Sequence, residues 1–190
     1  MRWVRELFAP TLRDYLDVEL GQRDTVFEDS RLEDGGNFPS QLYTRLGESA
    51  LLVPLLTASY FNRPWCVREF AVMREREKSL GIRENDDTRT LILPIFLGGR
   101  DMFPEPVKDM QSADFSRFYN AHLGEGTPRR EAFTEAVQNW ASRAATTFKQ
   151  TCPHSADFAK MRGNSMIDEL RPPAITIPVP SMIPPASAAA

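Results

Sequence analysis

The segment SYFNRPWCVREF, residues 59–70, holds the side chains best suited to chemistry. Within it, Glu69 falls early in an expected helix that directly follows an apolar run typical of a buried strand, and ligand sites in parallel sheets lie at the carboxyl ends of the strands. Helical spacing surrounds Glu69 with side chains that are mostly apolar, namely Trp65, Cys66, Val72 and Met73. A carboxylate in such surroundings resists ionisation unless a partner compensates, so Glu69 is a candidate catalytic group.

Taken by spacing alone, a structural role for Glu69 is the favoured interpretation. Single glutamates rarely identify an active site, and Glu69 lies close enough in the sequence to Arg63 and Arg68 to pair with either. It could also cap the helix that contains it. The residues alone therefore leave both roles open.

The two cysteines, Cys66 and Cys152, lie far apart and in different contexts, so the sequence shows neither a disulfide framework nor a repeated metal-ligand spacing. Neither His122 nor His154 is near Cys66. We therefore expect Cys66 to be a buried helix cysteine rather than a nucleophile or a ligand, and we expect no metal site.

Composition limits the classes of function. The chain has 190 residues, of which 42% are hydrophobic, which suits one domain with an appendage. Its 23 basic and 26 acidic residues are mixed along the chain, and the absence of a basic stripe argues against nucleic-acid binding. Charges at Arg2, Arg5 and Glu6 argue against a signal peptide, and no run reaches membrane-spanning length. We expect a soluble, cytoplasmic protein with no membrane partner.

Periodicity and turn residues predict helices that alternate with strands. The expected helices cover 3–21, 39–49, 65–78 and 128–148, and the expected strands cover 25–27, 50–56, 91–97 and a short stretch at 113–115. The last helix should begin with Thr127 as N-cap and Pro128 as first residue, with an apolar stripe of Phe133, Val137, Trp140, Ala144 and Phe148. The prolines inside two of the strands, Pro54 and Pro94, fit only a bulge or a sheet edge.

This alternation favours an α/β fold with a doubly wound parallel sheet, because each parallel connection needs a crossover. The sequence divides into a domain at 1–150 and a tail at 151–190. The segment RPPAITIPVPSMIPPASAAA at the end is dense in proline and alanine and has almost no charge. We expect the tail to be disordered or to act as a linker.

Three segments together resemble a known family. The pattern VFEDSRLEDGG, then LLVPLLTASYF, then WCVREF is similar to the second strand, the following loop, the third strand and the third helix of bacterial TIR (Toll/interleukin-1 receptor) domains. The resemblance runs from about Trp3 to Phe148, weakens at 100–126 and is absent from the tail. It implies a flavodoxin-like sheet with the strand order 2-1-3-4-5.

The resemblance also implies a reaction and the residues that carry it. Many bacterial TIR domains cleave the nicotinamide–ribose bond of NAD+, and their catalytic glutamate matches Glu69 in WCVREF. By the same resemblance, NAD+ is a substrate rather than a cofactor, and the substrate-binding candidates are Trp65, Ser59, Asp29 and Phe27. Trp65 could stack on nicotinamide or adenine, while Ser59 and Asp29 could bond ribose hydroxyls. Core packing for Trp65, a turn role for Ser59 and a loop cap for Asp29 are the competing interpretations.

The loop at 30–38 resembles the TIR loop that borders the substrate cleft and packs between subunits. Its candidate interaction residues are Leu32, Gly35, Gly36 and Phe38, and the paired glycines would let the loop move. Other TIR domains, including copies of this chain, are therefore the expected protein partners.

The resemblance breaks at the amino end, where a complete TIR domain has a strand and a loop before its first helix. This chain begins inside that helix at Trp3, so we expect the first strand to be missing and the sheet to be N-terminally truncated. A late start site, a fragment and a degenerate gene each explain this, and the first is favoured because every later element is intact. Loss of that strand would leave its neighbours unpaired and would remove one wall of the cleft.

Three functions follow from this interpretation. The first is an NAD+ glycohydrolase or cyclase in bacterial defence or stress signalling, with Glu69 as its catalytic residue. The second is a non-catalytic adaptor that binds other TIR domains through the loop at 30–38 and the helix of Trp65. The third and weakest is a nucleoside or deoxyribosyl transfer enzyme, which would act on nucleosides but not on NAD+.

Overall fold

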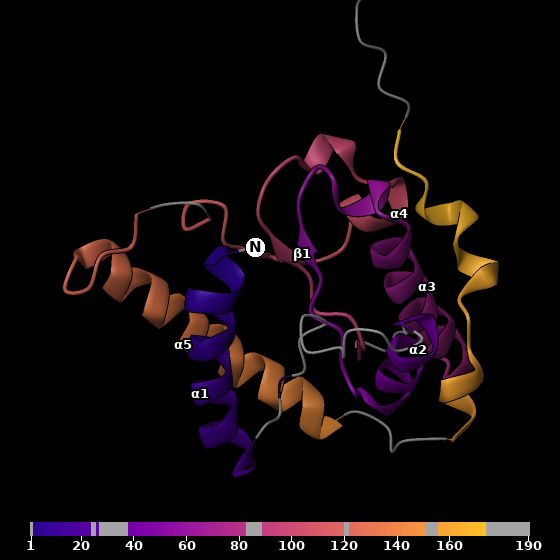
Figure 1. The fold of residues 1–190 in the computed structure, drawn as a ribbon, viewed down its shortest axis with the longest axis horizontal. Helices are drawn as coiled ribbons and strands as arrows, with labels where there is room; N and C mark the ends of the chain where they lie inside the picture. The colour runs from indigo at the N-terminus through magenta and orange to yellow at the C-terminus, as the bar shows by residue number, and fades with distance from the viewer. Residues whose placement is uncertain are drawn as a thin grey trace, which may run out of the picture.

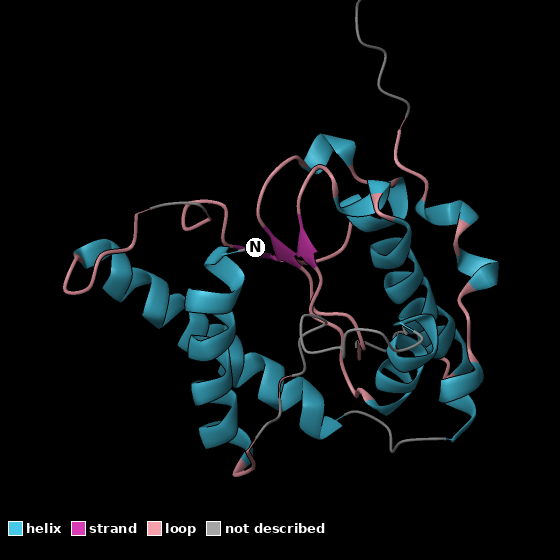
Figure 2. Cartoon of the chain, in the orientation of Figure 1, coloured by secondary structure: helices cyan, strands magenta, loops and turns pink. Residues whose placement is uncertain are grey.

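The computed structural model describes residues 2–23, 26, 38–82, 89–119, 122–150 and 156–173. The described elements form three layers, with a short parallel sheet between two layers of helices (Figures 1 and 2). One helical layer contains α1 (Ala9–Leu20) and α5 (Pro128–Gln150), and the other contains α2 (Phe38–Glu48), α3 (Pro64–Ser79) and α4 (Glu105–Lys108). This arrangement confirms the predicted α/β class.

The sheet contains β1 (Leu55–Leu56), β2 (Ile95–Phe96) and β3 (Ala113–Asp114), which pair in parallel in the order β1-β2-β3. Successive side chains on a strand point to opposite faces. Accordingly, Leu55 and Ile95 join the apolar cluster under α1 and α5, whereas Leu56 and Phe96 join the cluster under α3 and α4. Both faces of the sheet are therefore covered, as the continuous apolar runs predict.

The strands are shorter than predicted, and the prolines explain why. Leu52 and Ile92 form a separate parallel bridge before β1 and β2 begin. Between the bridge and the strands, the carbonyl of Pro54 accepts a bond from the Ile95 N–H at 3.0 Å, and that of Pro94 accepts one from the Ala113 N–H at 3.0 Å. A proline has no N–H to donate in return, so each one interrupts its ladder.

The amino-terminal helix follows the prediction and ends at Gly21, which adopts a left-handed conformation with φ of 64°. A π-helical turn, Val4–Phe8, precedes α1. This turn lies just before Pro10, whose ring and missing N–H disfavour a regular α-helical bond to the preceding turn. Phe8 and Leu12 are buried in the cluster shared with α5.

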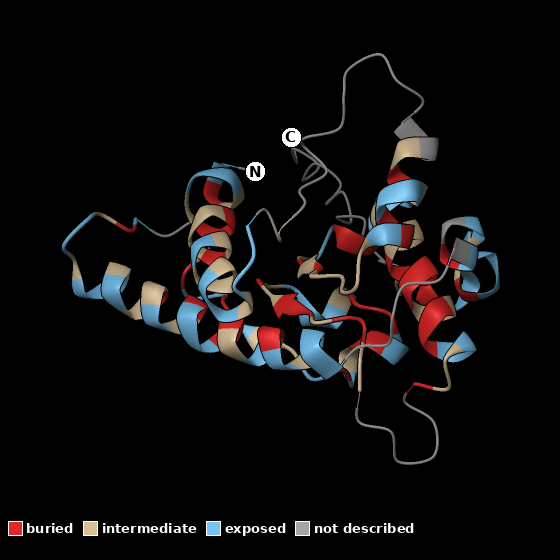
Figure 3. Ribbon diagram, turned by 90° about the horizontal axis from the view of Figure 1, so that it is seen from below, coloured by how far each residue is buried: buried red, intermediate tan, exposed pale blue. Residues whose placement is uncertain are grey.

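The closing helix, α5, begins as predicted, because the Thr127 side chain accepts a bond from the Arg130 N–H at 3.3 Å and Pro128 is the first helical residue. Four members of the predicted stripe, Phe133, Val137, Trp140 and Ala144, are buried against α1 and the sheet. The fifth member is the exception: Phe148 is 38% exposed. Figure 3 shows that buried residues line the sides of the helices that face the sheet and one another.

Helix α3 is the central helix of the second layer and the one that carries Glu69. Pro64 is its first residue, and the N-cap Arg63 has an extended conformation without a side-chain capping bond. Phe70 and Met73 anchor it in the cluster over the sheet, while Val72 packs with Leu42 of α2. The helix therefore contacts both the sheet and its neighbouring helix.

Although the composition predicts a tail from residue 151, residues 156–173 pack against the second helical layer (Figure 1). We name this segment the strap. It contains three 3-10 helices, η5 (Ala156–Lys160), η6 (Asn164–Met166) and η7 (Asp168–Leu170), which contact α2, α3 and α4 respectively. Phe158, Met166 and Leu170 are its buried side chains.

The strap and α2 are held together by a buried arginine of α3. Arg76 is 2% exposed, and its Nη1 donates to the carbonyls of Leu46 at 3.0 Å and Ser49 at 2.6 Å, at the carboxyl end of α2. Its guanidinium also lies 4.2 Å from the centre of the Phe158 ring in the strap. Burial lowers the pKa of Arg76 below its ordinary value. One side chain thus joins three segments of the chain.

Some predictions fall on residues that the structure does not describe. Of the predicted strand at 25–27, only Val26 is described, and residues 30–37 of the predicted interaction loop lie outside the described ranges. Within the described residues, β1, β2 and β3 match the 3-4-5 part of the predicted strand order. No helix in that part of the chain has the length and apolar character needed to cross a membrane.

Candidate functional site

The carboxyl ends of the three strands lead into turns and loops along one edge of the sheet. Thr57 follows β1, Gly98 and Gly99 follow β2, and Phe115 follows β3. Two of these segments touch: a Cβ atom built on Gly99 would lie 2.5 Å from the Cβ of Ala58. Gly99 has φ of 74°, so both its backbone conformation and the lack of space favour glycine there. The loops after β1 and β2 are therefore packed together at the edge where ligands bind in such sheets.

Glu69 lies on the helix that starts from this edge. It is partly buried and is the sixth residue of α3, which begins at Pro64. Only the first turn of a helix has unpaired N–H groups to cap, so this position does not fit a capping role. The described bonds of its neighbour Arg68 run to the strap, to the carbonyl of Arg162 at 2.9 Å and to the side chain of Asn164.

Trp65 lies one turn before Glu69 on α3 and is 39% exposed. Large aromatic side chains in this fold are otherwise mostly buried, as Phe61 and Phe70 are. Its exposure argues against the alternative that Trp65 is a core residue. Part of the Trp65 side chain is thus accessible one turn before the partly buried Glu69, and an accessible aromatic side chain suits stacking on a planar group.

Ser59 lies at the same edge, between β1 and α3. It is exposed and directly precedes the 3-10 helix η3 (Tyr60–Asn62), and its Oγ is 3.3 Å from the Oγ1 of Thr57. The following residues, Tyr60 and Phe61, are buried and hold this turn against the core. The structure therefore supports the turn role of Ser59 and also leaves its hydroxyl at the surface.

A charged group at the far end of the edge was not predicted from the sequence. Asp114 ends β3 and accepts a bond from the Ser116 N–H at 2.9 Å. The pKa of Asp114 is lowered by the Ser116 side chain and backbone, and further by the charges of Arg100 and Arg117. The sequence carries only part of the signal: Arg100 follows the apolar run at 91–97 and Asp114 lies in the expected strand at 113–115, but nothing in the sequence shows that the two strands are neighbours.

Arg100 is held in place by its own contacts. Its Nη1 donates to the Lys108 carbonyl at 3.1 Å, its Nη2 donates to the Ser112 Oγ at 3.0 Å, and its guanidinium lies 4.9 Å from the centre of the Phe96 ring. These bonds tie the loop after β2 to the segment that precedes β3. Arg100 thus stabilises the edge as well as carrying charge there.

Most of the remaining predicted site residues are not described by the structure. Phe27, Asp29, Leu32, Gly35 and Gly36 lie outside the described residues. Phe38, predicted as the end of the interaction loop, is the first residue of α2. The helix thus begins one residue before the start at Pro39 that the sequence predicts.

Metal chemistry has no candidate site in the described part of the chain, where no cluster of His, Cys, Asp and Glu residues could hold an ion. Cys66 is partly buried and packs against the cluster around Phe70, close to the predicted role of a structural cysteine.

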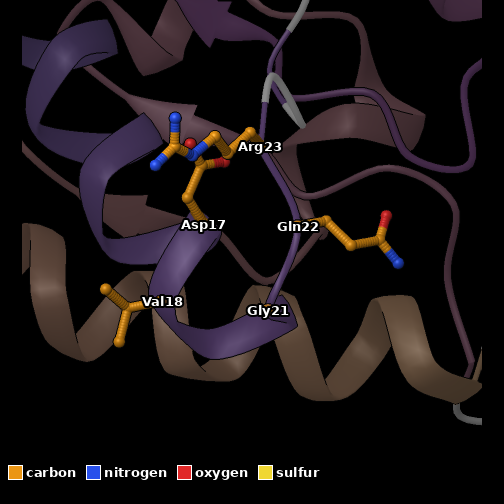
Figure 4. A pocket seen from close by; sticks show the side chains of 5 residues that line it. All are labelled: Asp17, Val18, Gly21, Gln22 and Arg23. Carbon is orange, nitrogen blue, oxygen red and sulfur yellow. The ribbon is translucent and has the colours of Figure 1, made fainter.

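A surface hollow of about 310 Å³ lies at the end of α1 and is lined by Asp17, Val18, Gly21, Gln22 and Arg23 (Figure 4). The Val18 side chain points outward and is 81% exposed. Among the described site candidates, Glu69, Trp65 and Ser59 do not line this hollow, and α1 lies on the other side of the sheet from α3.

Comparison with known protein families gives a match to the TIR domain over residues 2–126. This chain belongs to the TIR domain family. The match covers the elements from α1 to β3, including the edge and the helix of Glu69, and it ends before α5. The strap also lies outside the part of this TIR domain that the family match covers.

Among solved structures, this TIR domain is similar to the TIR domains in the structure of the activated Roq1 resistosome directly recognizing the pathogen effector XopQ. The sequences are 20% identical, the alignment covers 77% of this chain and 89% of that chain, and the TM-score is 0.37. A search of curated proteins found no match. The family assignment rests on the match over residues 2–126.

Proposed function

We propose that this TIR domain cleaves the nicotinamide–ribose bond of NAD+, with Glu69 as its catalytic carboxylate. The observation that carries the proposal is the position of Glu69: partly buried, past the first turn of α3, and one turn from the exposed ring of Trp65. The helix starts at the carboxyl edge of a parallel sheet, where ligands bind in this class of fold.

The reaction requires little from the protein beyond one correctly positioned negative charge. The bond between the ribose C1′ and the nicotinamide nitrogen breaks, its electron pair goes to that nitrogen, and nicotinamide leaves as a neutral molecule. Positive charge then grows on the ribose, where a carboxylate can stabilise the cation or form a transient covalent bond. Water adds at C1′ and releases a proton, or another group of the substrate attacks C1′ and closes a ring. No general acid is needed, because the leaving group begins as a cation.

Neighbouring groups supply binding rather than chemistry. Trp65 offers an exposed aromatic face for nicotinamide or adenine, and the surface hydroxyl of Ser59 offers a bond to ribose. Asp29 and Phe27 remain substrate-binding candidates from the sequence. The Glu69 carboxylate is the group whose loss should remove the chemistry, whereas loss of the others should weaken binding.

We further propose that the active form is an assembly of TIR domains that works in bacterial defence or stress signalling. The loop at 30–38, with Leu32, Gly35, Gly36 and Phe38, is the proposed contact between subunits. Activity should therefore rise with protein concentration or with a crowding agent, and an inactive dilute monomer is the expected ground state.

The test compares NAD+ consumption and nicotinamide release by concentrated protein and by two glutamate variants. Glu69→Gln keeps the shape of the side chain and removes its charge, and it should lower the rate by about a hundredfold or more. Glu105→Gln is the control, since Glu105 is an 82% exposed glutamate at the start of α4 that pairs with Lys108; it should keep the full rate. Equal rates for the wild type and Glu69→Gln would refute the proposal.

A second candidate is a non-catalytic adaptor that binds other TIR domains. The exposed Trp65 on α3 favours it, because tryptophan is enriched among the residues that dominate protein interfaces. In that case Trp65→Ala should abolish the self-association measured by light scattering. The wild type and all variants should leave NAD+ uncleaved. Nicotinamide release that depends on Glu69 would exclude a purely non-catalytic role.

A further inference from the structure

We propose that Arg68 is a positioning residue for Glu69 and acts by clamping the strap across α3. The inference rests on the proposed function, because it concerns the placement of the same carboxylate. It also assigns a role to a segment, residues 156–173, that lies outside the TIR family match.

The clamp consists of two oppositely charged side chains of α3 that hold one stretch of the strap. Nη1 of Arg68 donates to the carbonyl of Arg162 at 2.9 Å and to the side-chain oxygen of Asn164. Two turns later, Oε2 of Glu75 accepts a bond from the Gly163 N–H at 2.8 Å. Residues seven apart share a helix face, so the strap is held at both ends of one stripe on α3.

Between these two bonds, the strap lies directly on the helix backbone. A Cβ atom built on Gly163 would lie 2.6 Å from the nitrogen of Val72 and 2.7 Å from the carbonyl carbon of Ala71. Gly163 itself is buried. No side chain separates the two backbones. While the clamp is closed, α3 therefore has no room to rotate or slide beneath the strap.

The strap is itself fixed to the neighbours of α3. At one end, the Arg162 guanidinium lies 4.2 Å from the centre of the Tyr43 ring of α2. Phe158 lies against the guanidinium of Arg76, an α3 side chain that also bonds to carbonyls at the end of α2. At the other end, Leu170 is buried in the cluster that contains Val107 of α4. The clamp therefore fixes α3 relative to α2 and α4 rather than to a loose chain end (Figure 1).

At the amino end of α3, the N-cap Arg63 makes no side-chain capping bond. Arg68 is the clamp residue nearest this end, and it directly precedes Glu69. A side chain ends about 5 to 6 Å from its helix axis, so a rotation of about 10° moves a carboxylate by about 1 Å. A misplacement of about 1 Å can cost about a hundredfold in rate. The clamp is thus positioned to affect turnover without touching substrate.

The experiment measures kcat and KM for NAD+ in the full chain, together with hydrogen exchange of the amides of α3 and the strap. Arg68→Ala should lower kcat by about tenfold to a hundredfold and change KM by less than about threefold. Arg68→Lys, which keeps a donor and the charge, should recover part of kcat, and Asn164→Ala should show a smaller loss. Arg171→Ala is the matched control, because Arg171 is an exposed strap arginine that pairs with Asp168; its kcat should equal that of the wild type.

Exchange separates this inference from the proposed function. Arg68→Ala should raise exchange at 65–72 and 162–165 while leaving α5 protected. Faster exchange with an unchanged kcat would overturn the positioning role, and so would unchanged exchange. If wild type and Glu69→Gln are equally inactive on NAD+, the proposed function fails. The exchange of residues 65–72 then decides alone whether the clamp fixes this end of α3.

Discussion

Replacing Gly163 by alanine should release the strap from α3, and the size of the effect can be worked from the structure. Gly163 has φ of 66°, a left-handed conformation that costs a residue with a Cβ about 1 to 2 kcal/mol. The new Cβ would also lie 2.6 Å from the backbone nitrogen of Val72. Overpacking of this kind costs a further 1 to 3 kcal/mol, roughly. We expect a loss of about 2 to 5 kcal/mol in the free energy of unfolding.

The assay is urea unfolding followed by circular dichroism, with limited proteolysis of the folded protein as a second measurement. A matched control isolates the clash. Gly21 has nearly the same φ, 64°, but a Cβ built there meets nothing within 4 Å. Gly21→Ala should therefore lose only the conformational part, about 1 to 2 kcal/mol. Gly163→Ala should also make the strap more sensitive to protease, whereas Gly21→Ala should not.

Two results would refute this reasoning. If Gly163→Ala lost no more stability than Gly21→Ala, the close contact between Gly163 and α3 would carry no energy. If stability fell but the strap stayed resistant to protease, the added methyl group would have been accommodated by movement of α3 and not by release of the strap.

Three further predictions concern buried and edge residues. Arg76→Met should lower the free energy of unfolding in urea by about 1 to 3 kcal/mol, because carbonyls at the end of α2 lose their charged donor. Removal of the cost of burying that charge offsets part of this loss. No loss of stability would contradict the prediction. Gly99→Ala should lose about 2 to 5 kcal/mol in the same assay, because its Cβ would lie 2.5 Å from that of Ala58 and its φ is 74°. Asp114 has a lowered pKa in the fold, so its contribution to stability is present at neutral pH and lost below about pH 4 as the pH falls through the folded pKa. Asp114→Asn should thus reduce the difference in the free energy of unfolding between pH 7 and pH 3. An unchanged difference would contradict a contribution from the Asp114 carboxylate.

Periodicity predicted the helices well because their apolar residues face one neighbour throughout. Helix α5 shows this, since the residues from Phe133 to Ala144 at helical spacing all pack on α1 and the sheet. The exposure of Phe148 could not be predicted, because this residue continues the pattern beyond the layer that would cover it. A sequence pattern shows which face is apolar but not where the neighbouring layer stops.

The strap escaped prediction for a different reason. Its buried residues, Phe158, Met166 and Leu170, each belong to a separate short 3-10 helix. Their spacing of eight and four residues therefore does not come from one continuous helix. Gly163 looks like a linker glycine until the backbone of α3 is placed beside it. The proline-rich end of the chain then made the whole segment from residue 151 resemble a tail. Long-range contacts of this kind leave no local pattern.

The helix that carries Glu69 was predicted because its position depends on local order along the chain. The apolar run before Ser59 and the helix start at Pro64 were enough to place Glu69 near the carboxyl edge of the sheet. The group formed by Asp114, Arg100 and Arg117 comes from different strand ends, and sequence order does not show which strands are neighbours. Pairing of the strands was therefore needed to find it.

The most direct test of the central claim is nicotinamide release from NAD+ by concentrated protein, measured side by side for the wild type, Glu69→Gln and Glu105→Gln. We expect release by the wild type and by Glu105→Gln at the same rate, and a rate at least about a hundredfold lower for Glu69→Gln. Release that is the same in all three proteins, or absent from all three in assembled form, would contradict it.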